Sequence, residues 1–206
     1  LELIINFEDF QSVSSDEMTE KKIIESFQIC LESLETSEVL TENENISLSS
    51  KDVLRPDFVL YAPATESIII IELKNFVQPS RQAGTEVSAY ANEIKTYIPF
   101  ISDGDIVNII ISPVWSTLLC HYIFHEIFWQ QRNILCLEPV LNEDGIKLRI
   151  VDYKLFATEK ISLKLSEEHI GGYQICLYDD NLYVDHTNKT RLDPYVTQMK
   201  TALAAM

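Results

Sequence analysis

Apolar residues recur at helical spacing in two stretches of the chain. Over residues 20–34 they fall three or four positions apart, and residues 14–16, two serines and an aspartate, offer side-chain oxygens for a helix N-cap. Residues 81–98 have the same spacing, and Pro99 follows where the pattern stops. Both stretches are predicted to be helices with one apolar face. A third stretch, residues 115–131, is apolar on most sides and is also predicted to be a helix.

Short apolar or alternating runs predict strands between and after these helices. Residues 106–111 are nearly all apolar, which is typical of a buried central strand. Pro139 is expected to end the strand predicted over residues 134–138. The predicted strands span residues 46–49, 57–61, 67–74, 106–111, 134–138 and 146–151. Strands interleaved with helices indicate an α/β fold, in which a mixed central β-sheet is flanked by helices.

The pattern weakens after residue 154. We therefore predict a core domain over residues 1–155 and a small C-terminal α+β appendage over residues 156–206. The appendage would consist of a hairpin around residues 178–181 and a terminal helix over residues 192–205.

The composition is that of a folded globular chain, with 206 residues, 46% hydrophobic and 23% charged. No apolar run approaches the roughly 20 residues of a transmembrane helix, so no membrane partner is expected. The first ten residues contain no basic region, so a secretory signal is not expected either. The four cysteines form no CxxC pair and are predicted to be reduced in a cytoplasmic protein: Cys30, Cys120, Cys136 and Cys176.

The formal net charge of −16 opposes binding to nucleic acid. Residues 1–50 hold twelve acids and two lysines, so −10 of that charge lies in the first quarter of the chain. The remaining residues carry −6, with fourteen bases among them. Any binding of nucleic acid therefore requires local positive charge.

The chemistry-bearing residues lie between 55 and 75. In the strand over residues 67–74 the side chains alternate, so Glu72 and Lys74 share the face of two isoleucines and emerge where the core opens. If this strand pairs with the preceding one through an antiparallel hairpin, the 15-residue spacing brings Asp57 close to Glu72.

Two carboxylates and a backbone carbonyl at one cleft form a hard-oxygen site. Asp57, Glu72 and the carbonyl of Leu73 would suit Mg²⁺ or Mn²⁺, with waters completing the coordination. Such a metal ion polarises a phosphodiester and lowers the pKa of a bound water. Lys74 could orient that water or stabilise charge on the phosphate.

The dipeptide Pro56-Asp57, followed by the tripeptide Glu72-Leu73-Lys74, resembles the PD-(D/E)XK superfamily of restriction-endonuclease-like nucleases. The resemblance covers residues 15–115 and implies a restriction-endonuclease-like core. It also implies metal-dependent hydrolysis of nucleic acid, DNA more than RNA. Asp57 and Glu72 would bind the metal ion, and Lys74 would assist the nucleophilic water.

Two helices carry further residues that the resemblance implies. The superfamily often has a glutamate on its leading helix, and Glu20 fits best because it lies on the apolar stripe. Some members carry Q-x3-Y on the helix after ExK. Here Gln82, Glu86 and Tyr90 lie on one face, but the residue four before Tyr90 is a glutamate, which departs from the pattern. These three residues are candidates for substrate positioning.

Arg55 and Arg81 flank the motif and are candidates for holding phosphates. The acidic balance still predicts weak non-specific affinity or delivery of the nucleic acid by another domain or subunit. It also supports two alternatives: a catalytically silent nuclease-like fold that serves as a binding or assembly module, and an acidic mimic of nucleic acid.

The apolar stretch 115–131 allows two further interpretations. His121 and His125, four residues apart, could present two imidazoles to zinc, but the HExxH pattern and a third ligand are missing. The apolar character of this helix is explained first by burial in the core; its outer side could also pair two copies of the chain as a homodimer.

Overall fold

The computed structural model describes residues 2–49, 53–74, 80–143 and 145–157, without the side chains of residues 80–83. All of them belong to one compact unit, Leu1–Glu159. The predicted hairpin and terminal helix of the appendage lie outside the described residues. Phe156, assigned from the sequence to the appendage, is 1% exposed and packs in the core, so this unit extends past residue 155.

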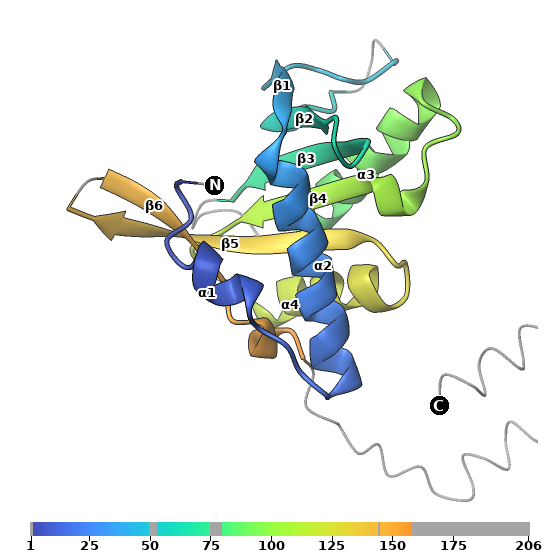
Figure 1. The fold of residues 1–206 in the computed structure, drawn as a ribbon. Helices are drawn as coiled ribbons and strands as arrows, with labels where there is room; N and C mark the ends of the chain where they lie inside the picture. The colour runs from blue at the N-terminus through green and yellow to red at the C-terminus, as the bar shows by residue number, and fades with distance from the viewer. Residues whose placement is uncertain (1, 50–52, 75–79, 144, 158–206) are drawn as a thin grey trace, which may run out of the picture. The chain divides into compact units, whose positions relative to one another are not determined.

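Six strands form one sheet in the order β1-β2-β3-β4-β5-β6 (Figure 1). The pairs β1–β2, β2–β3 and β5–β6 are antiparallel, whereas β3–β4 and β4–β5 are parallel. The sheet is therefore mixed, and the α/β class with flanking helices is confirmed. The strands are β1 (Glu38–Glu42), β2 (Phe58–Ala62), β3 (Ser67–Leu73), β4 (Ile106–Ile111), β5 (Asn133–Asn142) and β6 (Gly145–Ile150).

Helices cover both faces of the sheet. In Figure 1, α2 (Met18–Glu35) crosses in front of the strands, while α3 (Ser80–Tyr97) and α4 (Thr117–Phe128) lie behind them. The three helices match the predicted ones, although α4 is shorter than the apolar stretch at both ends. A short helix, α1 (Phe7–Gln11), precedes α2, and two 3-10 turns occupy Asp103–Asp105 and Tyr153–Leu155.

Alternation along β3 sends its side chains to two different helices. Ile69 packs in the core cluster that includes Phe27 of α2. Ile68 and Ile70 pack instead with Tyr90 on α3. The two faces of β3 are thus assigned as the sequence pattern predicts, and Glu72 lies on the side of α3.

The first edge strand was predicted at the wrong place. β1 carries mostly exposed side chains and has a bulge between Val39 and Thr41, so it lacks the apolar alternation that marks a half-buried strand. The predicted strand over residues 46–49 is wrong. Ile46 donates its N–H to the carbonyl of Leu54 and accepts from the Tyr97 hydroxyl, and these bonds fold the segment into a loop against α3.

Two local predictions also fail for identifiable reasons. Pro139 lies within β5 and does not end it. β5 pairs with β4 only as far as Leu137, so Pro139 lies where β5 has β6 alone as its partner, and a strand edge tolerates a proline. The N-cap of α2 is Glu17 rather than a residue of 14–16, since its carboxylate accepts the N–H of Glu20 at 2.8 Å. Ser15 caps indirectly, by accepting the N–H of Glu17.

Helix α2 also protects the inner part of β5, where β6 does not reach. The buried hydroxyl of Ser26 accepts the N–H of Ile134 at 2.9 Å and donates to its carbonyl at 3.2 Å. Four residues earlier, Lys22 Nζ donates to the carbonyl of Phe128, the last residue of α4. The N-terminal part of α2 therefore contacts β5 and the end of α4, two strands away from β3.

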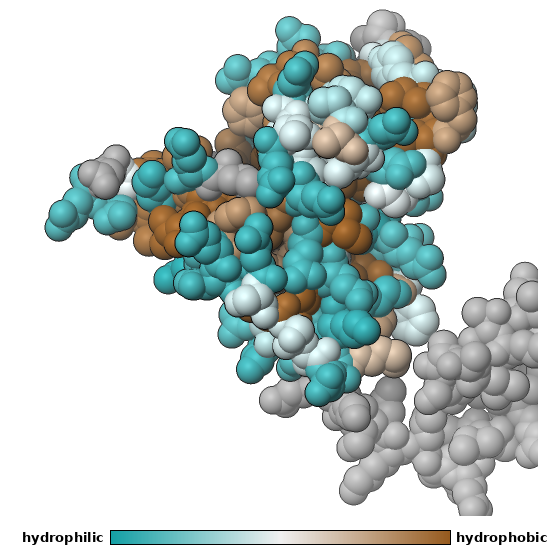
Figure 2. All heavy atoms as spheres, in the orientation of Figure 1, coloured by the Kyte–Doolittle hydropathy of each residue, from teal (hydrophilic) through white to brown (hydrophobic). Residues whose placement is uncertain are grey.

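The outward side of α2 is hydrophilic, as the teal spheres over it in Figure 2 show. Brown, apolar side chains gather on the β5–β6 arm, where Leu141 and Ile146 are exposed. Among the described residues, no helix combines the length and the apolar character needed to cross a membrane.

Candidate active site

Asp57 stands immediately before β2 and faces the end of β3. Phe58 pairs with Ile71, so the next position outward in this antiparallel register places Asp57 opposite Glu72. The Asp57 carboxylate accepts the backbone N–H of Leu73, with 2.6 Å between Oδ2 and N. The hairpin thus brings the two halves of the sequence motif together.

Glu72 is a buried carboxylate at the end of an apolar strand face, with 6% of the residue exposed. Oε1 accepts a hydrogen bond from Lys74 Nζ at 2.7 Å. Oε2 is buried and has no hydrogen-bond partner among the described residues. Burial raises the pKa of Glu72 from 4.5 to about 7; the Lys74 ammonium opposes this rise, and the charges of Asp57 and Glu86 add to it.

Lys74 bridges two carboxylates. Its ammonium contacts Glu72 and also donates to Glu86, which lies on α3. Burial lowers the pKa of Lys74, but hydrogen bonds to Glu72 and Glu86 outweigh burial, so the pKa is raised from its ordinary value. Lys74 is therefore a fixed, protonated group at neutral pH.

Tyr90 packs on the same side of the sheet and ties α3 to the start of the motif. Its hydroxyl donates to the carbonyl of Arg55 at 3.2 Å. Burial raises the pKa of Tyr90, and the nearby charges of Glu72, Glu86 and Asp57 raise it further. Glu86 and Tyr90 thus lie beside the Asp57–Glu72–Lys74 cluster, and the side chain of Arg55 is exposed next to it.

The donor atoms fit a hard divalent cation, with one restriction. Among the described residues, no three His, Cys, Asp or Glu side chains lie close enough together to hold a metal ion. A site here would consist of Asp57, the unpaired Oε2 of Glu72 and the carbonyl of Leu73, completed by waters, which suits Mg²⁺. Because Lys74 holds Oε1, the metal ion and the ammonium would share the carboxylate of Glu72.

The structure does not bring Glu20 to this cluster. Glu20 lies in the first turn of α2 and accepts a hydrogen bond from the Ser15 hydroxyl at 2.7 Å. That turn lies next to the end of α4, where Lys22 donates to the carbonyl of Phe128, and α2 covers the sheet face opposite to Glu72. The helical stripe predicts which side of α2 faces the core, but it does not predict which strand lies beneath each turn.

The side chains of Gln82 and Arg81 lie outside the described ones, so their predicted roles stay predictions.

One polar residue on the site's face of the sheet was missed. Asn108 is buried in the middle of β4, and the signal for it is a single amide in an otherwise apolar run.

The two histidines of α4 are exposed and line a groove of about 470 Å³ between α3 and α4. Tyr122 and Ser88 lie in the same groove, with their hydroxyls 3.3 Å apart. His125 Nδ1 lies 3.6 Å from Glu126, and no third ligand joins His121 and His125 within the described part of the chain. The zinc interpretation therefore has no support.

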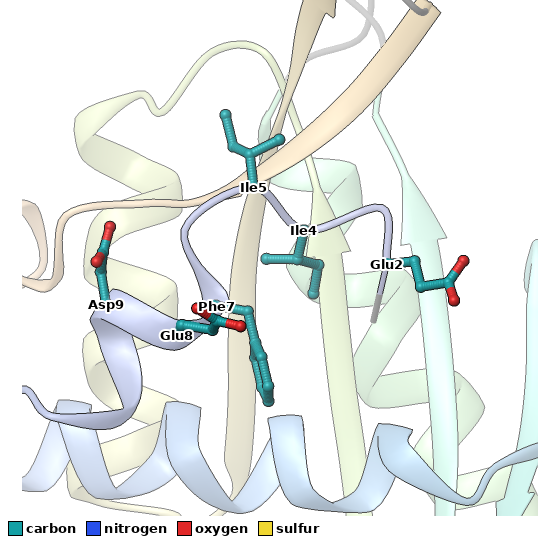
Figure 3. Close-up of a pocket in the computed structure, with 6 residues that line it drawn as sticks. All are labelled: Glu2, Ile4, Ile5, Phe7, Glu8 and Asp9. Carbon is teal, nitrogen blue, oxygen red and sulfur yellow. The ribbon is translucent and has the colours of Figure 1, made fainter.

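A pocket of about 410 Å³ lies beside the N-terminal segment, away from the motif residues. Figure 3 shows Phe7 pointing towards α2, while the carboxylates of Glu2, Glu8 and Asp9 lie at separate places around the segment. These carboxylates do not converge on a common point, so they form no alternative cation site.

No family model matches the chain, and no curated protein matches it. Among solved structures, the chain is similar to the crystal structure of an XisH family protein from Nostoc punctiforme PCC 73102. The identity is 15%, the alignment covers 59% of this chain and 93% of that chain, and the TM-score is 0.33.

Proposed function

We propose that this chain is a divalent-metal-dependent nuclease that hydrolyses phosphodiester bonds, DNA in preference to RNA. The observation that supports this proposal is that Asp57 lies beside Glu72 and Leu73 at one end of the hairpin, and that Lys74 donates a hydrogen bond to the carboxylate of Glu72. The order of these residues resembles PD-(D/E)XK nucleases, and a mixed α/β sheet is compatible with such a core.

Asp57, Glu72 and the Leu73 carbonyl would hold Mg²⁺ or Mn²⁺. When bound, the ion would polarise the phosphodiester and lower the pKa of a coordinated water. The chain's own residues would do the rest. Lys74 would present its ammonium to the attacking water or to charge that develops on the phosphate, and Glu86 would keep that ammonium in place.

The acidic charge remains the main difficulty for this function. Lys74 is already neutralised by two carboxylates, and Arg55 is the one exposed cation described beside the motif. We therefore expect weak binding to free DNA, or delivery of the DNA by another domain or subunit.

A second copy is a candidate partner, because Leu118 and Trp129 at the two ends of α4 are about half exposed. The free thiols of Cys30, Cys120 and Cys136 suit the cytoplasm as the compartment.

The first experiment is cleavage of supercoiled plasmid and of single-stranded oligonucleotide at low salt. Mg²⁺ or Mn²⁺ is compared with EDTA, and the wild type is compared with Lys74→Ala. Nicking that requires metal and is lost in the variant would support the nuclease. Absence of cleavage together with absence of Mn²⁺ binding in calorimetry would contradict it.

A binding or assembly module is the second candidate. The formal charge of −16 favours it, because such a surface repels nucleic acid but attracts basic proteins. The burial of the Glu72 carboxyl argues against it, since burial disfavours the charged form and a module without chemistry gains nothing from that cost. Metal binding separates the two candidates.

A further inference from the structure

Asn108 is another buried polar group that has no partner among the described residues and lies on the face of the sheet that carries Glu72. Only 1% of the residue is exposed, and neither Oδ1 nor Nδ2 has a hydrogen-bond partner among the described residues. A buried side-chain amide in this state costs free energy of folding. An apolar residue of similar volume would avoid that cost, and the rest of β4 is almost entirely isoleucine and valine.

The strand register places Asn108 next to Glu72. Asn108 pairs with Ile70 on β3 and with Ile134 on β5, while Glu72 pairs with Ile110. Paired residues share a face of the sheet, and so do residues two apart on one strand. Asn108 is therefore the diagonal neighbour of Glu72. Neighbouring strands lie about 4.8 Å apart and two residues span about 6.6 Å of strand, so the two backbone positions are roughly 8 Å apart, a gap that the two side chains and one water can bridge.

The hydroxyls that α3 and α4 bring to this layer have partners. Tyr90 donates to the carbonyl of Arg55, and the hydroxyls of Ser88 and Tyr122 lie within hydrogen-bond distance of each other. Among the described residues, the unpaired atoms on this face are those of Asn108, Oε2 of Glu72 and the hydroxyl of Thr41, which lies on the edge strand β1, three strands from Asn108. Two neighbouring unpaired groups, one an amide donor and the other a carboxylate acceptor, have complementary chemistry.

We propose that Asn108 is a positioning residue for Glu72, whose side-chain amide hydrogen-bonds through one buried water to Oε2 and fixes the orientation of the carboxylate. A carboxylate oxygen can accept this bond and still bind a cation with its second lone pair. Residues that hydrogen-bond to a metal-binding side chain, without binding the metal ion themselves, commonly orient that side chain. The role in metal binding depends on the proposed nuclease site; the hydrogen-bonded pair itself does not.

The first test is Mn²⁺ binding by calorimetry, with Asn108→Leu beside the wild type. Leucine has the same number and branching of side-chain heavy atoms but cannot hydrogen-bond, so we expect a melting temperature equal to or above that of the wild type. We also expect the Kd for Mn²⁺ to increase about tenfold or more. Ile134→Leu, which alters packing beside Asn108 without removing a polar group, should stay within twofold. A folded Asn108→Leu protein with wild-type affinity would overturn the proposal.

The second test needs no metal ion. The Asn108 side-chain amide signals in a ¹⁵N NMR spectrum, identified by their loss in Asn108→Leu or, if that variant does not fold, in Asn108→Ser, should shift in Glu72→Gln. They should stay in place in Asp57→Asn. Unchanged signals in Glu72→Gln would overturn the proposal even if the wild type binds Mn²⁺. Shifted signals in a wild type that does not bind Mn²⁺ would instead refute the nuclease function alone.

Discussion

Asp57 and Leu73 are joined by a hydrogen bond in which the backbone N–H of Leu73 donates to the Asp57 carboxylate, with 2.6 Å between N and Oδ2. The backbone pairing of β2 and β3 begins one step further in, at Phe58 and Ile71. The side chain of Asp57 therefore extends the hairpin by one interaction and fixes its own position beside Glu72. One carboxylate serves both the local structure and the candidate metal site.

Asp57→Asn separates these two roles. Asparagine keeps an oxygen that can accept the Leu73 N–H, so we expect the melting temperature to stay close to that of the wild type. The lost charge should remove most Mn²⁺ binding and all detectable cleavage. Asp57→Ala should also abolish cleavage, but it loses the hydrogen bond and should cost about 0.5–1.5 kcal/mol. Calorimetry with Mn²⁺ and thermal melts measure both effects; a wild-type Mn²⁺ affinity in Asp57→Asn would contradict the site.

Lys74→Ala supplies the comparison for that experiment. It should abolish cleavage while leaving the circular dichroism spectrum near that of the wild type, because Lys74 contacts two carboxylates rather than the core, and Glu72 can take up a proton once the ammonium is gone. Unfolding of this variant would make Lys74 a structural residue.

The hairpin shows what the sequence could predict. Strand alternation placed Glu72 and Lys74 on one face, and the 15-residue spacing placed Asp57 opposite Glu72; both depend on local geometry that a strand imposes everywhere. Glu86 and Tyr90 follow from helical periodicity in the same way. These arguments need only the chain between residues 55 and 90.

The failures involve partners that are distant in the sequence. The position of Glu20 depends on where α2 crosses the sheet, which Ser26 and Ile134 determine over 108 residues. Pro139 is tolerated because β4 stops pairing at Leu137, and no pattern within β5 carries that information. β1 is a polar edge strand whose pairing with β2 is likewise invisible to apolar periodicity.

The raised pKa of Glu72 predicts that metal affinity increases with pH. The pKa lies at about 7, so the carboxyl is largely protonated at pH 6 and largely ionised at pH 8. Only the ionised form binds a cation well, and the Kd for Mn²⁺ should therefore fall severalfold between these pH values. Calorimetry at pH 6, 7 and 8 tests this. An affinity independent of pH would mean that Glu72 is not a ligand.

The same shift has the opposite consequence for stability without metal. The folded pKa of Glu72 is above its ordinary value of 4.5, so the folded state binds the proton more tightly than the unfolded state does. The contribution of this group is therefore most favourable below pH 4.5 and is lost as the pH rises through about 7. Glu72→Gln should be more stable than the wild type at pH 8, by on the order of 1–3 kcal/mol, and similar to it near pH 5. Urea unfolding at both pH values, in EDTA, measures the difference; an equal difference at both would contradict it.

Glu86→Gln tests the role of the second carboxylate on Lys74. Burial lowers the pKa of Lys74 and its two carboxylate partners raise it, so removing one charge should lower the pKa. If cleavage requires the protonated ammonium, the alkaline limb of the pH–rate profile should move to lower pH. Glu32→Gln, which alters an exposed glutamate on α2, should leave the profile unchanged. An unshifted limb in Glu86→Gln would show that Lys74 does not control it.

Gly84→Ala tests the close contact between α3 and α4. A Cβ atom at Gly84 would lie 2.7 Å from Cδ2 and 2.8 Å from Cγ of the Tyr122 ring, so the ring or the helix would have to move. Overpacking of this kind costs about 1–3 kcal/mol, whereas alanine gains about 1 kcal/mol over glycine in a helix. We expect net destabilisation in urea unfolding, of up to about 2 kcal/mol. Gly104→Ala is the matched control, because its Cβ would approach only the Ser102 hydroxyl, at 3.4 Å, and should change stability little. A Gly84→Ala protein more stable than the wild type would show that α3 and α4 are not packed this closely. Glu86, two residues further along α3, would then be less firmly placed beside Lys74.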